Sequence, residues 1–148
     1  MTPRFLVALA AVLLAGCAMV TRPSPSAAPA GPLSCGGRDF NVYFEGQSTE
    51  LSADARAVID ATGAGLNGCR IDQVRIIGST DVSGGERDNE EISKLRAKTM
   101  ADYLEDHFHW PRDHMVLMVT GERGAVTDEG LNVPMRRRAR IVVEASAP

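Results

Sequence analysis

Asp81 and Arg96 are the two residues of this sequence whose chemistry and spacing suggest a binding site. Asp81 directly follows a β-rich run, Val74 to Thr80, and Arg96 lies fifteen residues later in a charged segment. A carboxylate attracts an ammonium group, and a guanidinium binds a carboxylate through two parallel N–H bonds. If both side chains face one short cleft, they can hold the zwitterionic end of an amino acid.

Arg96 also lies on a helical face that should be buried. Steps of four from Ile92 reach Arg96 and later Leu104, which is the spacing of an apolar helical face. Three interpretations are open. The side chain extends to solvent along its apolar stem, pairs with Glu91 or Asp81, or faces a pocket for an anionic ligand.

The elements that must position these residues follow from periodicity and capping signals. Strands are predicted at 40–46, 73–80, 114–120 and 138–144, and helices at 53–66, after an N-cap at Ser52, and at 87–108. The order β-α-β-α-β-β predicts an α+β domain, with two helices packed on one face of a mixed sheet.

The first 33 residues are not expected to be part of this fold. Residues 1–16 have a positive start and an apolar run too short to span a bilayer, and so predict a signal peptide. The end of that run, Leu14-Ala15-Gly16-Cys17, resembles a bacterial lipobox, which implies an acylated Cys17; an ordinary signal with a chance cysteine is the alternative. Residues 17–33 form a Pro/Ser/Ala linker, and the folded domain is expected at 34–148.

The remaining cysteines, Cys35 and Cys69, predict a disulfide because an exported chain meets an oxidising compartment. Catalytic thiols are the alternative, but no CxxC spacing supports them. A net charge of −3 argues against nucleic acid as a partner, despite the basic run 136–140. We predict no cofactor and no metal site, although three histidines, His107, His109 and His114, lie close in sequence.

The motif around the two charged residues resembles a known family. The sequence "GSTD", followed by Asn89, Ser93 and Arg96-Ala97, is similar to the G-x-T-D … N-x-x-L-S-x-x-R-A signature of the OmpA-like peptidoglycan-binding domain. The interval from Asp81 to Arg96 matches that signature. Together with a lipobox and a linker, such a domain resembles the peptidoglycan-associated lipoproteins.

This resemblance implies a site and a role. Arg96 would bind the carboxylate of diaminopimelate in uncrosslinked peptide stems, and Asp81 its ammonium; Asn89 and Thr80 would shape the loop. Gln47 would form one wall, where many relatives carry an aspartate after a phenylalanine, which puts affinity in doubt. We expect alanine at Arg96 or Asp81 to abolish binding without unfolding the domain.

The implied function is structural rather than enzymatic. An acylated Cys17 would sit in the outer membrane, with the domain in the periplasm binding peptidoglycan. Ala18 after Cys17 fits outer-membrane sorting as it is known for enteric lipoproteins. The alternative is an envelope protein-interaction module with weak or lost wall binding. An enzyme is a third class, but no pair of carboxylates and no nucleophile with a base has the spacing for catalysis.

Overall fold

The structure, a computed structural model, describes residues 35–148 of the chain. The predicted signal peptide, the predicted lipidation site Cys17 and the linker 17–33 lie outside the described residues. Among the described residues, no helix has the length and apolar character needed to cross a membrane.

The described residues form the six predicted elements in the predicted order. They are β1 (Arg38–Tyr43), α1 (Ala53–Ala64), β2 (Arg70–Ser79), α2 (Glu86–Phe108), β3 (Met115–Gly121) and β4 (Arg138–Ser146), with two short 3₁₀ turns, η1 (Arg112–His114) and η2 (Pro134–Arg136). The Ser52 hydroxyl accepts a hydrogen bond from the Ala55 N–H and caps α1 as expected. The first strand ends three residues earlier than predicted, because the chain turns at Gly46, whose φ is +46°.

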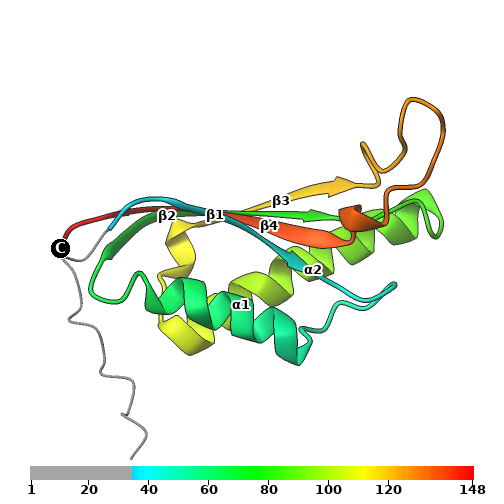
Figure 1. Cartoon of the computed structure of the whole chain (residues 1–148). Coiled ribbons are helices and arrows are strands. Elements are labelled where there is room, and N and C mark those ends of the chain that lie inside the picture. The colour runs from blue at the N-terminus through cyan, green and yellow to red at the C-terminus, as the bar shows by residue number, and fades with distance from the viewer. Residues whose placement is uncertain (1–34) are drawn as a thin grey trace, which may run out of the picture. The chain divides into compact units, whose positions relative to one another are not determined.

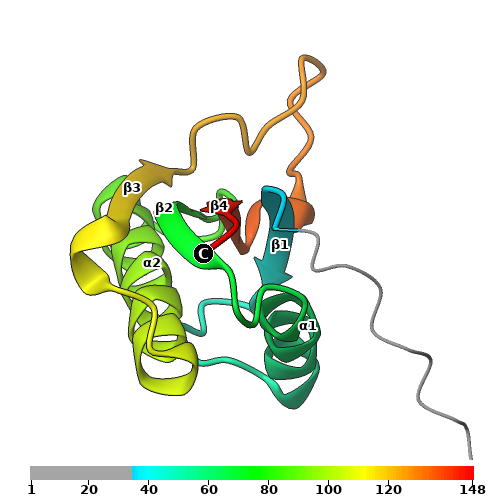
Figure 2. The ribbon, with the colours of Figure 1, turned by 90° about the vertical axis from the view of Figure 1, so that its left-hand side faces the viewer.

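The four strands form one mixed sheet in the order β1-β4-β2-β3. The β4 strand lies between β1 and β2 and is antiparallel to both, whereas β2 and β3 are parallel and joined through α2. Both helices lie on one face of the sheet, and the connection from β3 to β4 extends on the other side (Figure 1, Figure 2). The predicted α+β layering is therefore confirmed.

The hydrophobic core lies between the sheet and the two helices. Alternate residues of β4 face it, as the period of a strand with one covered face requires. Its largest fully buried apolar side chains are Val42, Ile59, Val74, Ile76, Met100, Leu104, Ile141 and Val143. Arg96 is buried among them, with no exposed surface.

Gly78 allows α2 to approach β2 very closely. A Cβ atom built on Gly78 would lie 1.9 Å from the Ser93 carbonyl oxygen, closer than atoms can come. The Ser93 hydroxyl donates to the Asn89 carbonyl one turn earlier. Gly78, the glycine of "GSTD", thus allows the short distance between β2, which ends near Asp81, and α2, which carries Arg96.

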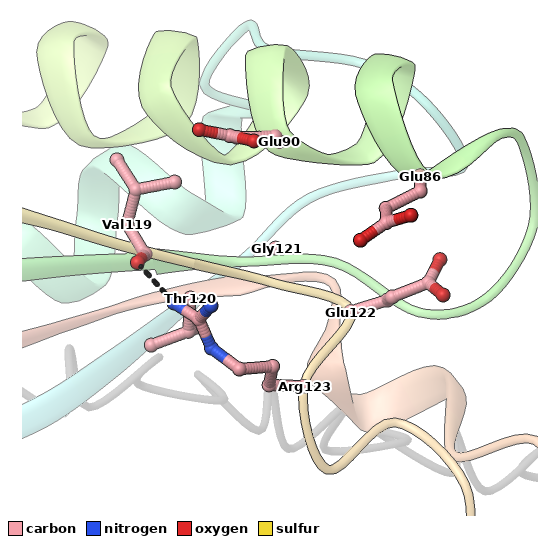
Figure 3. A pocket seen from close by; sticks show the side chains of 7 residues that line it. All are labelled: Glu86, Glu90, Val119, Thr120, Gly121, Glu122 and Arg123. Carbon is pink, nitrogen blue, oxygen red and sulfur yellow. Dashed lines mark hydrogen bonds between the residues drawn. The ribbon is translucent and has the colours of Figure 1, made fainter.

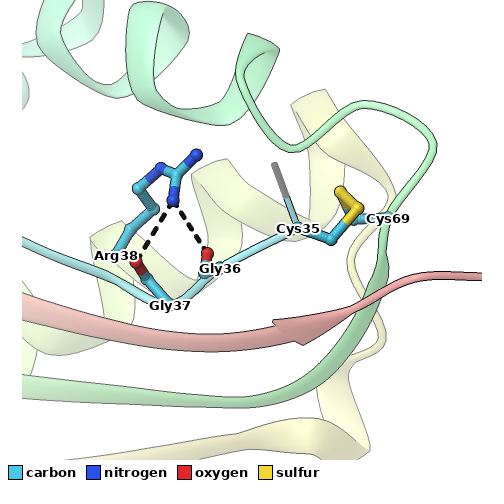
Figure 4. The surroundings of a disulfide bond; sticks show 5 residues. All are labelled: Cys35, Gly36, Gly37, Arg38 and Cys69. Atoms are coloured by element: carbon cyan, nitrogen blue, oxygen red, sulfur yellow. Dashed lines mark hydrogen bonds between the residues drawn. A yellow bond between two sulfur atoms is a disulfide. The ribbon is translucent and has the colours of Figure 1, made fainter. Parts of the chain in front are cut away.

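A disulfide ties the start of the described chain to the beginning of β2. Cys35 and Cys69 are bonded, with their Cα atoms 5.5 Å apart (Figure 4). The predicted pairing is thus present. The bond closes a loop that contains β1 and α1, and so holds the edge strand β1 near the rest of the sheet.

Candidate ligand-binding site

The Arg96 guanidinium is held by three backbone carbonyls and not by a carboxylate. Its Nε donates to the Ser48 carbonyl at 2.9 Å, Nη1 to the Ser79 carbonyl at 3.1 Å and Nη2 to the Gly46 carbonyl at 2.7 Å. The guanidinium carbon lies 5.0 Å from the centre of the Phe44 ring, within the range of a cation–π contact. Arg96 therefore joins the end of β2 to the turn after β1.

These bonds leave part of the guanidinium unused. Arginine has five N–H donors in a planar fork, and the described contacts account for three of them, one on each nitrogen. One N–H on Nη1 and one on Nη2 have no acceptor among the described residues. Terminal guanidinium N–H groups are donors that a ligand carboxylate can use.

Burial dominates the electrostatics of Arg96. It lowers the pKa of the guanidinium to about 10, while the charge of Asp81 raises this pKa and that of Arg137 lowers it. The side chain therefore stays protonated at neutral pH. A buried cation with no ion-pair partner is costly, and the three carbonyl dipoles offset part of that cost.

Asp81 is almost fully buried, at 2% exposure, and its oxygens are occupied. Oδ1 accepts from the Ser83 hydroxyl at 2.5 Å, and Oδ2 accepts from the Asn132 amide at 3.3 Å. The Arg137 Nε lies 3.9 Å from Oδ2. Burial raises the pKa of Asp81, but the hydrogen bonds from Ser83 and Asn132 and the charge of Arg137 outweigh it, so the pKa lies below its usual 3.8.

Asn89 and Thr80 lie at the same end of the domain, as the sequence motif implied. The fully buried Asn89 donates from Nδ2 to Glu122 at 2.5 Å, while its Oδ1 is buried without a partner. Thr80 is 1% exposed, and its N–H donates to the Gly121 carbonyl at 3.0 Å. Because buried polar atoms are nearly always hydrogen-bonded, the free Asn89 oxygen marks a place that a ligand donor or a water would fill.

Gln47 connects the turn after β1 to the loop that carries Asp81. Its Nε2 donates to the Ser83 carbonyl at 2.9 Å. Gly84 has a φ of +131°, and a Cβ there would lie 3.0 Å from both Gln47 Nε2 and Asn89 Oδ1. Gly84 thus leaves room for both amide side chains.

The structure excludes two of the three interpretations of Arg96. The side chain does not extend to solvent, because it has no exposed surface. It forms no ion pair with Asp81 within 4.0 Å, and Glu91 pairs with Lys94 instead. As expected, the end of β2 and the buried face of α2 meet here. Asp81 and Arg96, however, do not form a direct ion pair.

Three contributors to the site were not assigned from the sequence. Asn132 and Arg137 lie more than fifty residues after Asp81, and nothing in their local pattern marks a contact with it. Arg137 belongs to the basic run 136–140, and Arg137-Arg138 resembles the N-R-R run of the OmpA-like domain, but no contact with Asp81 was inferred from either signal. Ser83 follows Asp81 by two residues, the spacing of a local side-chain turn, and this signal could have been used.

A small cavity lies beside this site, where the start of α2 meets the end of β3. It has a volume of about 100 Å³, and its wall includes Glu86, Glu90 and Glu122. Glu86 and Glu122 point toward one another across it (Figure 3). Ordinary ligand pockets measure about 300 to 1,000 Å³, and carboxylates repel an anionic ligand, so we assign this cavity no ligand.

The three histidines serve separate structural roles. His107 stacks on Tyr103 and lies 3.4 Å from Asp60, His109 ends α2 with a left-handed backbone, and His114 Nδ1 lies 2.7 Å from the Ile71 carbonyl oxygen. Across residues 35–148, no group of three or more His, Cys, Asp or Glu side chains is placed to hold a metal ion.

The sequence from residue 43 to residue 140 matches the model of the OmpA family. The chain belongs to the OmpA family. The matched range includes both helices, β2, β3 and every residue of the site, and excludes most of β1 and most of β4. No curated protein sequence matches the chain.

Solved structures show the same fold in other OmpA-like domains. The OmpA-like domain of FopA1 from Francisella tularensis is 16% identical, with a TM-score of 0.61 over 76% of this chain and 73% of that one. The cell wall anchor of the T6SS from Pseudomonas aeruginosa is 19% identical, with a TM-score of 0.58 over 74% and 82%. The peptidoglycan-associated lipoprotein from Burkholderia pseudomallei is 16% identical, with a TM-score of 0.54 over 72% and 89%.

Proposed function

We propose that this domain binds peptidoglycan non-covalently, through the free amino and carboxylate groups of diaminopimelate in uncrosslinked peptide stems. The observation that carries the proposal is the meeting of Asp81 and Arg96 at one end of the sheet, with the pKa of Asp81 below its usual value and that of Arg96 still well above neutral pH. Two solved relatives are named a cell wall anchor and a peptidoglycan-associated lipoprotein, which supports the same ligand class.

Each ligand group has a matching group in the domain. The ligand carboxylate takes the two unused N–H donors of Arg96, and the ammonium binds Asp81. Asn89 Oδ1, buried without a partner, accepts a further N–H of the same ammonium. Because the two charges lie on different elements, only a ligand with both an amino group and a carboxylate satisfies them together.

The described state of the site is closed, so binding requires a local displacement. Asp81 and Arg96 are 2% and 0% exposed, and Asn132 and Arg137 occupy the side of Asp81 where an ammonium would bind. Both belong to the connection between β3 and β4. We infer that the ligand ammonium replaces Arg137 as the cation near Asp81, while this connection moves aside.

The cellular role that we propose is a membrane–wall tether. An acylated Cys17 anchors the chain in the outer membrane, and the linker lets the domain reach the wall from the periplasm. Stable anchoring takes more than one acyl chain, which lipobox processing supplies. Many copies, each binding weakly, hold the two layers together by avidity.

Co-sedimentation with purified sacculi tests the binding. Residues 34–148, which include every described helix and strand and the disulfide, are mixed with diaminopimelate-type sacculi. The variant Asp81→Asn removes the charge with little change in shape. The matched control is Asp39→Asn, which affects an exposed carboxylate paired with Arg140. We expect the wild type and the control to pellet and Asp81→Asn to remain in solution.

Sacculi whose peptide stems contain lysine in place of diaminopimelate provide a second comparison in the same experiment. Lysine carries the side-chain amine of diaminopimelate but lacks its second carboxylate, so these sacculi should bind poorly. Equal binding to both types would argue against recognition of a zwitterion. If Asp81→Asn pellets like the wild type, the site is wrong; if the wild type never pellets, the role is that of an envelope protein-interaction module.

The anchor is tested separately in cells. Cys17→Ala should abolish labelling by a fatty acid and release the protein from the membrane fraction. Persistence of the label would overturn the lipidation proposal without affecting the wall-binding one.

A further inference from the structure

The β3 strand forms an open edge of the sheet. It pairs with β2 on one side only, and β1 forms the opposite edge (Figure 2). An edge strand presents unpaired N–H and C=O groups that can bind another strand. One of them is the Val119 carbonyl, which accepts a hydrogen bond from the Arg123 side chain at 3.0 Å (Figure 3).

The strand lacks the charges that usually protect an edge. Its sequence, MVLMVTG, has no charged residue and no proline, although natural edge strands commonly carry lysine or proline. Its register with β2 is regular from Met115 to Val119 and shifts only after Val119. Val116, Leu117 and Met118 are 45%, 38% and 46% exposed. These three are consecutive, so apolar surface lies on both faces of the edge.

The two faces of the edge can be identified from its pairing with β2. Leu117 aligns with the buried Ile76 and so lies on the helix-covered face. Val116 and Met118 align with Arg75 and Ile77 and lie on the open face. A partner strand must therefore be apolar on both faces, and β3 itself satisfies this requirement.

We propose that two copies of this chain associate through β3, paired antiparallel about a two-fold axis at Met118. Each Leu117 then faces Val119 of the second copy on the helix-covered side, and the two Met118 side chains face each other on the open side. The Leu117 N–H of the second copy replaces Arg123 as donor to the Val119 carbonyl. The two sheets become one continuous sheet.

Charge complementarity near the strand ends favours this occupant. Asp113 lies in η1, directly before β3, and Arg123 lies in the turn after β3; both are exposed. Antiparallel pairing about Met118 places η1 of one copy beside this turn of the other, twice by symmetry. Apart from its bond to Val119, Arg123 has no described side-chain partner, and it is free to pair once that bond is replaced.

Cysteine cross-linking of the full chain tests both the contact and its register. Residues opposite one another in a non-hydrogen-bonded antiparallel pair have Cα atoms about 4.5 Å apart, within the usual range for a disulfide. Met118→Cys should therefore cross-link to itself. The control Val116→Cys is equally exposed, but its two copies would be offset by four residues, or roughly 13 Å. It should stay uncross-linked.

A charge exchange supplies the second measurement. By sedimentation equilibrium, Asp113→Arg and Arg123→Asp should each weaken the dimer about ten-fold, since two ion pairs are lost. The double variant should restore association. Both positions are exposed, and circular dichroism checks that each variant folds. A wild type that stays monomeric at every concentration, or a Val116→Cys variant that cross-links as readily as Met118→Cys, overturns the proposal.

Discussion

Arg96 and Asp81 lie at one end of the sheet without forming an ion pair. Arg96 donates to the carbonyls of Gly46, Ser48 and Ser79, while Asp81 accepts from Ser83 and Asn132 and lies 3.9 Å from Arg137. Each charge is therefore stabilised by other groups while the site is closed. The two charges are held in place before the ligand arrives, but the proposed displacement of the connection between β3 and β4 adds a cost to binding.

Replacement of Arg96 should cost stability as well as binding. Arg96→Ala leaves three carbonyls without their donor and a cavity beside Phe44, so we expect a loss of about 3 to 5 kcal/mol in the free energy of unfolding. This result would differ from the expectation from the sequence, which was that alanine at Arg96 leaves the domain folded. Urea denaturation measures the loss, with Arg75→Ala, an exposed arginine paired with Glu144, as a control expected to change by under about 0.5 kcal/mol.

Replacement of Arg137 should strengthen binding. Arg137→Gln removes the cation that competes with the ligand ammonium near Asp81, so we expect a lower Kd for sacculus fragments. Arg138→Gln is the neighbouring control, because no ion pair involves it among residues 35–148. Calorimetric titration measures the Kd. A higher Kd for Arg137→Gln would mean that Arg137 contacts the ligand directly.

A methyl group on Gly78 should disrupt the domain. The added Cβ meets the Ser93 carbonyl, which is backbone and cannot rotate away, so α2 must move from the sheet. We expect Gly78→Ala to cost about 3 kcal/mol or more. Gly85→Ala is the matched control, because its nearest neighbour is the tip of Asp88 at 3.5 Å. Equal melting temperatures for the two variants would contradict the close packing.

Reduction of the disulfide should lower stability without changing the fold. A loop of 34 residues corresponds to about 3 to 4 kcal/mol in the chain-entropy estimate. Denaturation of the Cys35→Ser/Cys69→Ser double variant measures this cost. Loss of sacculus binding by the folded double variant would show that the bridge also acts on the site, which lies at the other end of β2.

The charge of Asp81 gives a defined pH dependence. Its pKa in the folded state lies below 3.8, so ionised Asp81 favours the folded state above its ordinary pKa, and this stability is lost as pH falls below it. The stability difference between wild type and Asp81→Asn should therefore shrink in acid. Denaturation from about pH 6 to pH 3 measures it; a difference that grows in acid would contradict the lowered pKa.

The sequence by itself determined the element order, the Ser52 cap, the disulfide partners and the family motif. These depend on local signals: periodicity, capping chemistry and the fixed interval between Asp81 and Arg96. A helix that carries an arginine on its apolar face showed that the core had to accommodate a charge. The family resemblance also singled out Asn89 and Thr80, which the structure places at the same end of the domain.

Only the tertiary structure decided what surrounds the two charges. Asn132, Arg137 and the carbonyls of Gly46 and Ser48 come from segments distant in sequence, and contacts of this kind leave no periodic signal. The sheet order also depended on the fold, because β4 lies between β1 and β2 although it is last in the chain. That order leaves β3 unpaired at an edge, since strand pairing is set by packing over the whole core and not by position along the chain.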